Sequence, residues 1–445
     1  MRRERERACF VLSNDVWTPP SDLALSVEDT AEMLSTVLDM ASTCETVSIL
    51  SSLPISDRTF LPAGHHMRPI QLSIDSVTDE IRQTFESTVK PSLAKHGLTG
   101  KDVSVVVTAG STYSPLPPQS ARLCNLLECT SDVTALNMTG TGNSMAVTAL
   151  ATAAAVLRGM SKPGVAVVAI SENMSTLMYG GRDAKFLESN ALKRLGCACI
   201  ILSTRRVDKK RAKYRVCDTA TTCSFFGPEE VAESFDVDDV GVPGFRRNKP
   251  CIYEANLINQ VQLAYSKIES NNQTHVIVEP SHPDMTRLGY KALGMEDQVE
   301  EQDSSMSAFH AFGDVGPAAC WYGLAHREAS PGIKKGERVM LMAISGSLYT
   351  GTAILEACRD IAGTWENLED PTRVREMFDR YYLGLPQREL MFRVSERDAM
   401  LRKVDSQMFY PYTHGIWTSD TTRFKKAVVQ LEQLYRQLNA DSPTG

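Results

Sequence analysis

Apolar residues along the chain follow two alternating patterns. Five short runs are apolar at nearly every position, which is typical of strands buried on both faces of a sheet; they span residues 103–108, 165–170, 195–202, 274–278 and 338–345. Longer segments repeat apolar residues at helical spacing; they span residues 70–96, 146–155, 255–270 and 283–293. Helix and buried strand thus alternate, which predicts a layered α/β fold.

The stretch at residues 133–157 (VTALNMTGTGNSMAVTALATAAAVL) combines both patterns. An apolar lead-in reaches Gly140 and Gly142, and an alanine-rich segment follows, so we predict a strand, a tight glycine turn and a buried helix. Such a turn places Asn143 at a helix N-terminus, where free backbone N–H groups can hold an anion or a developing oxyanion. Alternatively, the two glycines only allow the helix to pack closely.

The second half of the chain repeats the element order of the first, which indicates an internal duplication without visible sequence repeats. Residues 204–250 are polar and charged, and we interpret them as an excursion over the surface; residues 294–307 resemble a polar linker. From Trp365 onward aromatic residues are frequent, and residues 422–438 predict an amphipathic helix. These features divide the chain into an N-terminal segment (1–60), a first half (61–250), a second half (251–364) and a C-terminal extension (365–445).

Composition narrows the classes of protein. The formal net charge of −7 argues against nucleic acid as a partner. The 11 cysteines lack the paired spacing of a metal site, so we expect no metal and a reducing compartment. No run of about 18 apolar residues occurs, and the N-terminus lacks the apolar core of a signal peptide. We therefore expect a cytoplasmic protein without a membrane span.

Four ordered motifs resemble a known family: LNMTGTGNSMAV, ISENMSTLMYGGRDAKFLESNALKRLGCACIILS, FHAFGDVGPAACWYGLA and KKGERVMLMAISGS. They are similar to motifs of the plant-type 3-ketoacyl-CoA synthases and of the chalcone synthase-like type III polyketide synthases, which are thiolase-fold condensing enzymes. The resemblance covers residues 53 to 358. It implies a thiolase-like five-layer αβαβα fold with two similar halves, here with a C-terminal helical extension, and a homodimer that would use the strand at 165–170. The membrane-spanning N-terminus of the plant enzymes has no counterpart in this sequence.

In this family a cysteine at a helix N-terminus takes an acyl group from coenzyme A, and a histidine and an asparagine then activate a malonyl partner. Carried over residue by residue, the cysteine falls on Asn143, the histidine on His282 in Ser-His-Pro, and the asparagine on Asp314 in Phe-Gly-Asp. His310 matches a histidine that the ketoacyl synthases carry just before that motif. An amide cannot serve as the acyl-accepting nucleophile, because activation needs a thiolate or a similar group. Ordinary condensation is therefore not expected.

Three functions stay open, and none needs a cofactor beyond the thioester substrate. The first is direct acyl transfer from a coenzyme A or carrier-protein thioester to oxygen or nitrogen, in lipid or specialised metabolism. His282 would then be the base, Asp314 would orient it, and Asn143 would stabilise the oxyanion; a variant makes Ser144 the nucleophile.

The second function is decarboxylation of a malonyl thioester without condensation, although Asp314 would oppose the charge of the enolate. The third is a catalytically inactive paralogue that binds a thioester or regulates an active condensing enzyme. Both histidines also have a structural interpretation, because His282 could cap a helix and His310 could be packed in the core.

Overall fold

The computed structural model describes residues 7–38, 53–56, 58–66, 74–111, 113–179, 184–224, 231–239, 241–248, 250–268, 275–296, 299–346, 348–365 and 370–383. The chain divides into two compact units, residues 1–181 with 185–383 and residues 182–184 with 384–445. Apart from Ala184, the second unit lies outside the described residues, and so does the helix expected at 422–438. All strands that the structure describes belong to the first unit.

A nine-stranded mixed sheet organises the first unit, in the order β11-β12-β13-β8-β1-β7-β6-β4-β5. Its strands are β1 (Phe10–Val16), β4 (Val103–Ala109), β5 (Thr134–Met138), β6 (Val165–Ser171), β7 (Cys197–Ser203), β8 (Tyr214–Cys223), β11 (His275–Val278), β12 (Arg338–Ser345) and β13 (Tyr349–Ala357). Two further antiparallel pairs join β2 (Ala24–Ser26) to β3 (Arg58–Phe60) and β9 (Glu233–Val237) to β10 (Pro243–Arg247). The five apolar runs of the sequence correspond to β4, β6, β7, β11 and β12, so these strand predictions are confirmed.

The two halves of the large sheet share one strand pattern. β4 runs parallel to β6, which is antiparallel to β7, which is antiparallel to β1. In the same way β11 runs parallel to β12, which is antiparallel to β13, which is antiparallel to β8. β1 pairs with β8 and thereby joins the halves. The expectation of two similar halves is confirmed.

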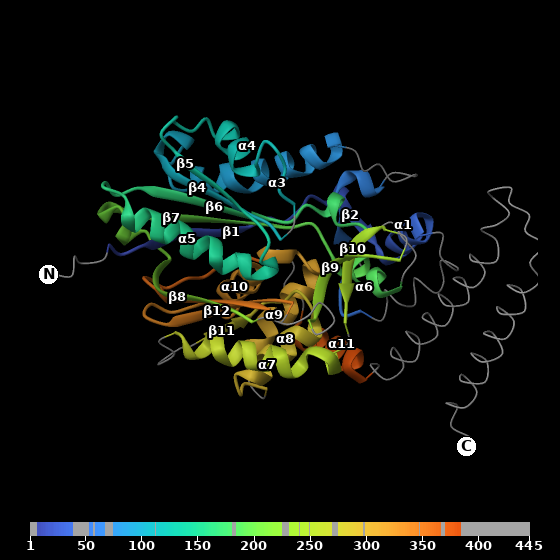
Figure 1. The fold of residues 1–445 in the computed structure, drawn as a ribbon. Helices are drawn as coiled ribbons and strands as arrows, with labels where there is room; N and C mark the ends of the chain where they lie inside the picture. The colour runs from blue at the N-terminus through green and yellow to red at the C-terminus, as the bar shows by residue number, and fades with distance from the viewer. Residues whose placement is uncertain are drawn as a thin grey trace, which may run out of the picture. The chain divides into compact units, whose positions relative to one another are not determined.

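Helices cover both outer faces of the sheet and fill the space between its halves (Figure 1). They are α1 (Val27–Leu38), α3 (Ile74–Ala94), α4 (Gln119–Leu126), α5 (Met145–Gly159), α6 (Ala184–Leu192), α7 (Pro250–Ser266), α8 (Pro283–Ala292), α9 (Val299–Phe312), α10 (Ala319–Ala329) and α11 (Pro371–Leu383). α3 and α4 pack on the first half, α7 and α8 on the second, and α5 and α10 contact strands of both. This arrangement is the expected five-layer αβαβα fold.

The alanine-rich helix α5 explains how the central layer forms. Ala146, Ala149 and Ala153 are all buried, in one hydrophobic core with residues of both sheet halves. Small side chains let the helix backbone approach the strands on either side without leaving voids. The small side chains of α5 therefore allow the N-terminus of this helix to lie deep inside the fold.

Two segments differ from the sequence-based expectation. Residues 204–250 do not simply run over the surface, because β8 occupies 214–223 inside the sheet and pairs with β13 along its length. Its sequence YRVCDTATTC alternates polar and apolar residues with several threonines, so it lacks the continuous apolar run of its neighbours. Residues 294–307 are not only a linker, because α9 begins at Val299 and buries Ser304 and Ser305 where a helix usually buries apolar residues.

The N-terminal segment also contributes to the sheet, since β1 pairs with β7 and β8. β6, which was expected at a dimer interface, is hydrogen-bonded to β4 on one edge and β7 on the other and is buried at every position. Its edges are thus unavailable to a second copy, whereas β5 lies at the end of the sheet. In the part of the chain that the structure describes, no helix is both long and apolar enough to cross a bilayer.

Candidate functional site

A glycine turn carries Asn143 to the start of α5, as the sequence predicted. Gly140 and Gly142 have φ values of +99° and +54°, in the left-handed region that favours glycine. A Cβ atom on Gly142 would clash with the side chain of Ser345, so the turn also favours a glycine for space. Asn143 lies in the short 3-10 turn Gly142–Ser144, and its exposed fraction is 9%. The site is thus deep inside the fold.

The side chain of Asn143 already has a partner. Its Nδ2 atom donates a hydrogen bond to Oε1 of Glu279 at 2.7 Å. The neighbouring Ser144 is buried, and its hydroxyl donates to the carbonyl oxygen of Thr141 at 2.6 Å. Ser144 therefore points back into the turn and does not fit the role of nucleophile.

Glu279 is a residue of this site whose role was not predicted from the sequence. It directly follows β11, its exposed fraction is 3%, and its carboxylate also accepts from the Ser281 hydroxyl and from the backbone N–H of Ile344 at 2.9 Å. Burial raises the pKa of Glu279 to about 8, although the hydrogen bonds from Ser281 and Asn143 act in the opposite direction. In the sequence, the feature that could have pointed to Glu279 is its position at the end of a predicted strand, three residues before His282.

His282 caps α8. Its Nδ1 atom accepts a hydrogen bond from the backbone N–H of Asp284 at 3.2 Å, and Pro283 follows at the first helical position. The capping role that the sequence offered as an alternative is therefore present. Because Nδ1 is an acceptor, the neutral ring carries its proton on Nε2 and presents a donor there. A ring in this tautomer donates a hydrogen bond and does not act as a base through Nε2.

Asp314 does not orient His282, which corrects the base-and-orienter pair expected from the sequence. Its Oδ1 atom accepts from the N–H of Gly316 at 2.9 Å, and its Oδ2 atom pairs with Lys193 Nζ at 3.3 Å and Arg247 Nη2 at 3.2 Å. Asp314 is fully buried. A buried carboxylate needs such partners, because desolvation would otherwise force its protonation.

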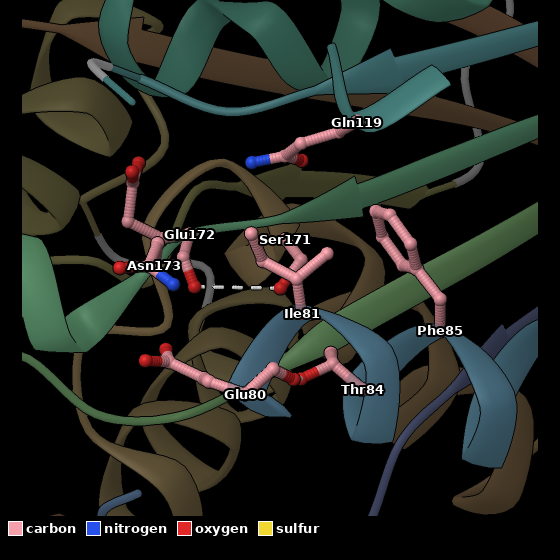
Figure 2. A pocket seen from close by; sticks show the side chains of 8 residues that line it. All are labelled: Glu80, Ile81, Thr84, Phe85, Gln119, Ser171, Glu172 and Asn173. Atoms are coloured by element: carbon pink, nitrogen blue, oxygen red, sulfur yellow. Dashed lines mark hydrogen bonds between the residues drawn. The ribbon is translucent and has the colours of Figure 1, made fainter. Parts of the chain in front are cut away.

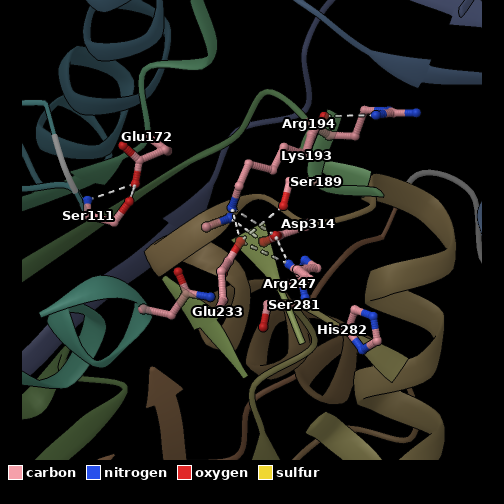
Figure 3. A network of polar contacts seen from close by, with 12 residues as sticks. Ser111, Glu172, Ser189, Lys193, Arg194, Glu233, Arg247, Ser281, His282 and Asp314 are labelled. Atoms are coloured by element: carbon pink, nitrogen blue, oxygen red, sulfur yellow. Dashed lines mark hydrogen bonds and ion pairs between the residues drawn. The ribbon is translucent and has the colours of Figure 1, made fainter. Parts of the chain in front are cut away.

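Glu233, which is half-buried, completes a network of two cations and two carboxylates whose other members are buried (Figure 3). Its Oε1 atom lies 3.3 Å from Lys193 Nζ and 3.4 Å from Arg247 Nη2. Burial alone would lower the pKa of Lys193, but the Asp314 and Glu233 carboxylates raise it above its ordinary value. The Lys193 ammonium also lies over the Phe245 ring, 4.3 Å from its centroid.

These partners of Asp314 were not predicted from the sequence either. Glu233 and Arg247 come from the β9–β10 hairpin, inside a segment interpreted as surface, and Lys193 follows α6. Charge runs usually indicate solvated faces, and no local pattern marks the charges that turn inward. The only available signal was Lys193 within the motif that resembles the condensing enzymes.

His310 lies in α9 and is attached to another part of the chain. Its Nδ1 atom is 3.3 Å from the carbonyl oxygen of Pro54, and its own carbonyl accepts from the N–H of Ser56 at 2.7 Å. The side chain is buried. These contacts fasten residues 53–56 to α9, which agrees with a packed, structural histidine.

A second cluster of buried carboxyl groups lies at the end of β6 (Figure 2). The gap between these residues leaves no room for a water molecule, and it is lined by Glu80, Ile81, Thr84, Phe85, Gln119, Ser171, Glu172 and Asn173. Glu172 accepts from the backbone N–H of Ser111 at 2.7 Å, and Glu80 accepts from the N–H groups of Met174 and Ser175. Burial raises the pKa of Glu80 to about 7 and that of Glu172 above its ordinary value. Both carboxyls support loops beside the site, whereas Glu279 contacts Asn143 directly.

The five-layer fold, with its site at the start of α5 and the ends of β11 and β12, defines a thiolase-like protein. A family model described as FAE1/Type III polyketide synthase-like protein matches residues 1–226. The chain belongs to this family of thiolase-like condensing enzymes, whose members handle acyl thioesters.

Individual relatives agree with this assignment. The chain is 24% identical to 3-ketoacyl-CoA synthase 16 of Arabidopsis thaliana over 404 residues, which cover 82% of this chain and 81% of the relative. It is also 24% identical to 3-ketoacyl-CoA synthase 8 of the same plant over 359 residues, which cover 72% and 74%. Among solved structures, CsyB in complex with CoA-SH has a TM-score of 0.65 at 16% identity, over 78% of this chain and all of CsyB. At this identity, the structural likeness establishes the fold.

Proposed function

We propose that the protein binds the thioester of coenzyme A or of an acyl carrier and transfers the acyl group directly to an oxygen or nitrogen acceptor, without an acyl-enzyme. The observation that carries the proposal is the amide of Asn143 at the start of α5, where the family's cysteine would stand. An amide cannot be acylated as a thiolate can, so the acceptor has to attack the thioester itself. We place this reaction in lipid or specialised metabolism, in a cytoplasmic homodimer.

His282 would serve as a hydrogen-bond donor in this reaction. Attack of the acceptor on the carbonyl carbon moves the π electrons onto the carbonyl oxygen, and the Nε2–H of His282 would stabilise the resulting oxyanion. Collapse of the tetrahedral intermediate then breaks the C–S bond and releases the thiolate of coenzyme A. The hydrogen bond from the Asp284 backbone to Nδ1 holds the neutral ring in the donor tautomer.

The test combines turnover with intact-protein mass. The purified chain is incubated with a panel of acyl-CoAs, with and without alcohol or amine acceptors, and free thiol and protein mass are followed. Release of coenzyme A only with an acceptor, and no acyl adduct on the protein, is expected. An acyl adduct on the wild-type chain would refute the direct route.

A matched pair of variants separates the two roles of His282. Asparagine is a good helix cap, so His282→Asn keeps an acceptor for the Asp284 N–H but removes the Nε2 donor. We expect His282→Asn to retain the melting temperature and to lose about 100-fold in turnover, the typical effect of removing one oxyanion donor. His282→Ala should lose both turnover and about 1 kcal/mol of stability. Equal turnover of His282→Asn and wild type would exclude His282 as the donor.

Decarboxylation of a malonyl thioester is the second candidate, and one feature of the site favours it. The negative charge of Asp314, which would oppose an enolate, is balanced by Lys193 and Arg247. Release of labelled carbon dioxide from malonyl-CoA without an acceptor would support this function over acyl transfer. A chain that turns over no thioester and co-purifies with a cysteine-bearing homologue would instead be the inactive partner.

A further inference from the structure

The proposed transfer leaves one chemical task without an assigned residue. The attacking hydroxyl or amine must lose a proton, and the tautomer of His282 makes this ring a donor rather than a base. Asp314 and Glu233 form ion pairs with Lys193 and Arg247. A proton acceptor has to come from another side chain of the site.

Glu279 has the contacts that such a group requires. Its Oε1 atom is 2.7 Å from Nδ2 of Asn143. By the resemblance to the condensing enzymes, Asn143 stands where the family has its acyl-accepting cysteine. Its described partners are neutral donors, namely the Asn143 amide, the Ser281 hydroxyl and the Ile344 N–H. Within the described residues no lysine or arginine forms an ion pair with it, in contrast to Asp314. Its charge is thus not held by a neighbouring cation and its carboxyl can exchange a proton.

The backbone around Glu279 fixes the position of the carboxyl group. Its N–H donates to the carbonyl oxygen of Met342 at 2.9 Å, and its carbonyl accepts from the Thr286 hydroxyl at 2.8 Å. The first contact continues the pairing of β11 with β12, and the second ties the residue to α8. The backbone of Glu279 is thus fixed both at the end of β11 and at the start of α8. Its carboxyl group is therefore preorganised, and proton transfer requires such a fixed position.

We propose that Glu279 accepts the proton of the attacking alcohol or amine, an inference that rests on the proposed direct acyl transfer. The O–H or N–H bond of the acceptor breaks, its proton moves to the Glu279 carboxylate, and its electron pair forms the new bond to the carbonyl carbon. The carbonyl π electrons become the oxyanion held by His282. Collapse breaks the C–S bond, and the Glu279 carboxyl returns the proton to the departing thiolate, so the step needs no oxidant, reductant or metal.

The surroundings of Glu279 tune this carboxyl for the task. Burial, together with the negative charge of Asp314, raises its pKa to about 8. Cys320 of α10 is a further titratable group beside it, and the pKa of the Cys320 thiol is raised by burial and by Glu279. A general base works best when its pKa lies near the working pH. The transfer rate should therefore rise with pH through about 8 and level off above it.

The experiment measures kcat, KM and the pH profile of acyl transfer for wild type, Glu279→Gln and Glu172→Gln. Glu172 is a matched control, because it is also a buried strand-end carboxyl with a serine donor but lies outside the contacts of Asn143. We expect Glu279→Gln to lower kcat by about 100-fold, leave KM within a factor of about three and abolish the rise with pH. Glu172→Gln should keep the wild-type pH profile.

A second variant keeps the carboxyl and changes only its titration. Ser281→Ala removes a donor that stabilises the ionised form, so the rise in rate should move to higher pH. This test holds even if Glu279→Gln folds poorly. Two results would overturn the role of Glu279 but not the proposed direct acyl transfer. One is a pH profile of Ser281→Ala that matches wild type, and the other is a Glu279→Gln variant with wild-type rates and pH dependence. A wild-type chain that turns over no thioester overturns the proposed function, and this inference with it.

Discussion

Replacing Glu279 with glutamine should change how stability depends on pH. The folded protein holds this carboxyl at a pKa of about 8, against 4.5 for the ordinary group, because burial penalises the charged form. A carboxyl whose pKa is raised on folding contributes stability that is complete below pH 4.5 and is lost as pH rises through 8. Wild-type stability should therefore fall across this window, and the neutral glutamine should remove that part of the fall.

The structure gives the size of the effect. The difference of 8 − 4.5 = 3.5 between the two pKa values corresponds to about 5 kcal/mol at ~1.4 kcal/mol per pKa unit. An amide cannot accept from all three donors that contact Glu279, so the variant also loses about 1–3 kcal/mol at every pH. Glu279→Gln should thus be less stable than wild type at pH 5 and more stable, by about 2–4 kcal/mol, at pH 9.

Urea unfolding followed by tryptophan fluorescence at pH 5, 7 and 9 measures this crossing. The buried carboxyls Glu80 and Glu172, whose pKa values are also raised, titrate in both proteins, so only the difference between variant and wild type reports Glu279. Parallel stability curves for the two proteins would show that Glu279 is ionised throughout and would refute the reasoning.

Four further variants test other parts of the structure. Asp314→Asn leaves one carboxylate to balance two buried cations, so it should lower the free energy of unfolding in urea by about 3–5 kcal/mol. The double variant Asp314→Leu with Lys193→Met removes one charge of each sign and should lower it less. An equal loss of stability in both variants would mean that the charges do not compensate each other. Gly142→Ala should cost at least about 2 kcal/mol, because φ is +54° and the new Cβ would meet Ser345, and an unchanged melting temperature would contradict this geometry. Tyr382→Phe removes the hydrogen bond of 3.1 Å from the Tyr382 hydroxyl to the carbonyl oxygen of Pro283, and it should lower the free energy of unfolding by about 1 kcal/mol. An unchanged free energy of unfolding would show that this bond is absent in solution.

The sequence by itself determined the elements whose pattern is local. Continuous apolar runs identified strands such as β6 and β7, which are buried on both faces and so have no polar positions to interrupt them. Gly140 and Gly142 fixed the turn before α5, because only glycine adopts their backbone conformation readily. The proline after His282 likewise allowed a helix start to be expected there.

Only the tertiary structure decided which side chains meet. Asp314 looked like the partner of His282, but its charge is balanced by Lys193 and by Arg247, which lies 67 positions away in the sequence on a hairpin interpreted as surface. The Asn143–Glu279 pair spans 136 positions and joins the two halves of the fold. Such contacts depend on how strands and helices assemble, and a polar residue carries no local mark that tells whether its charge will face solvent or a buried partner.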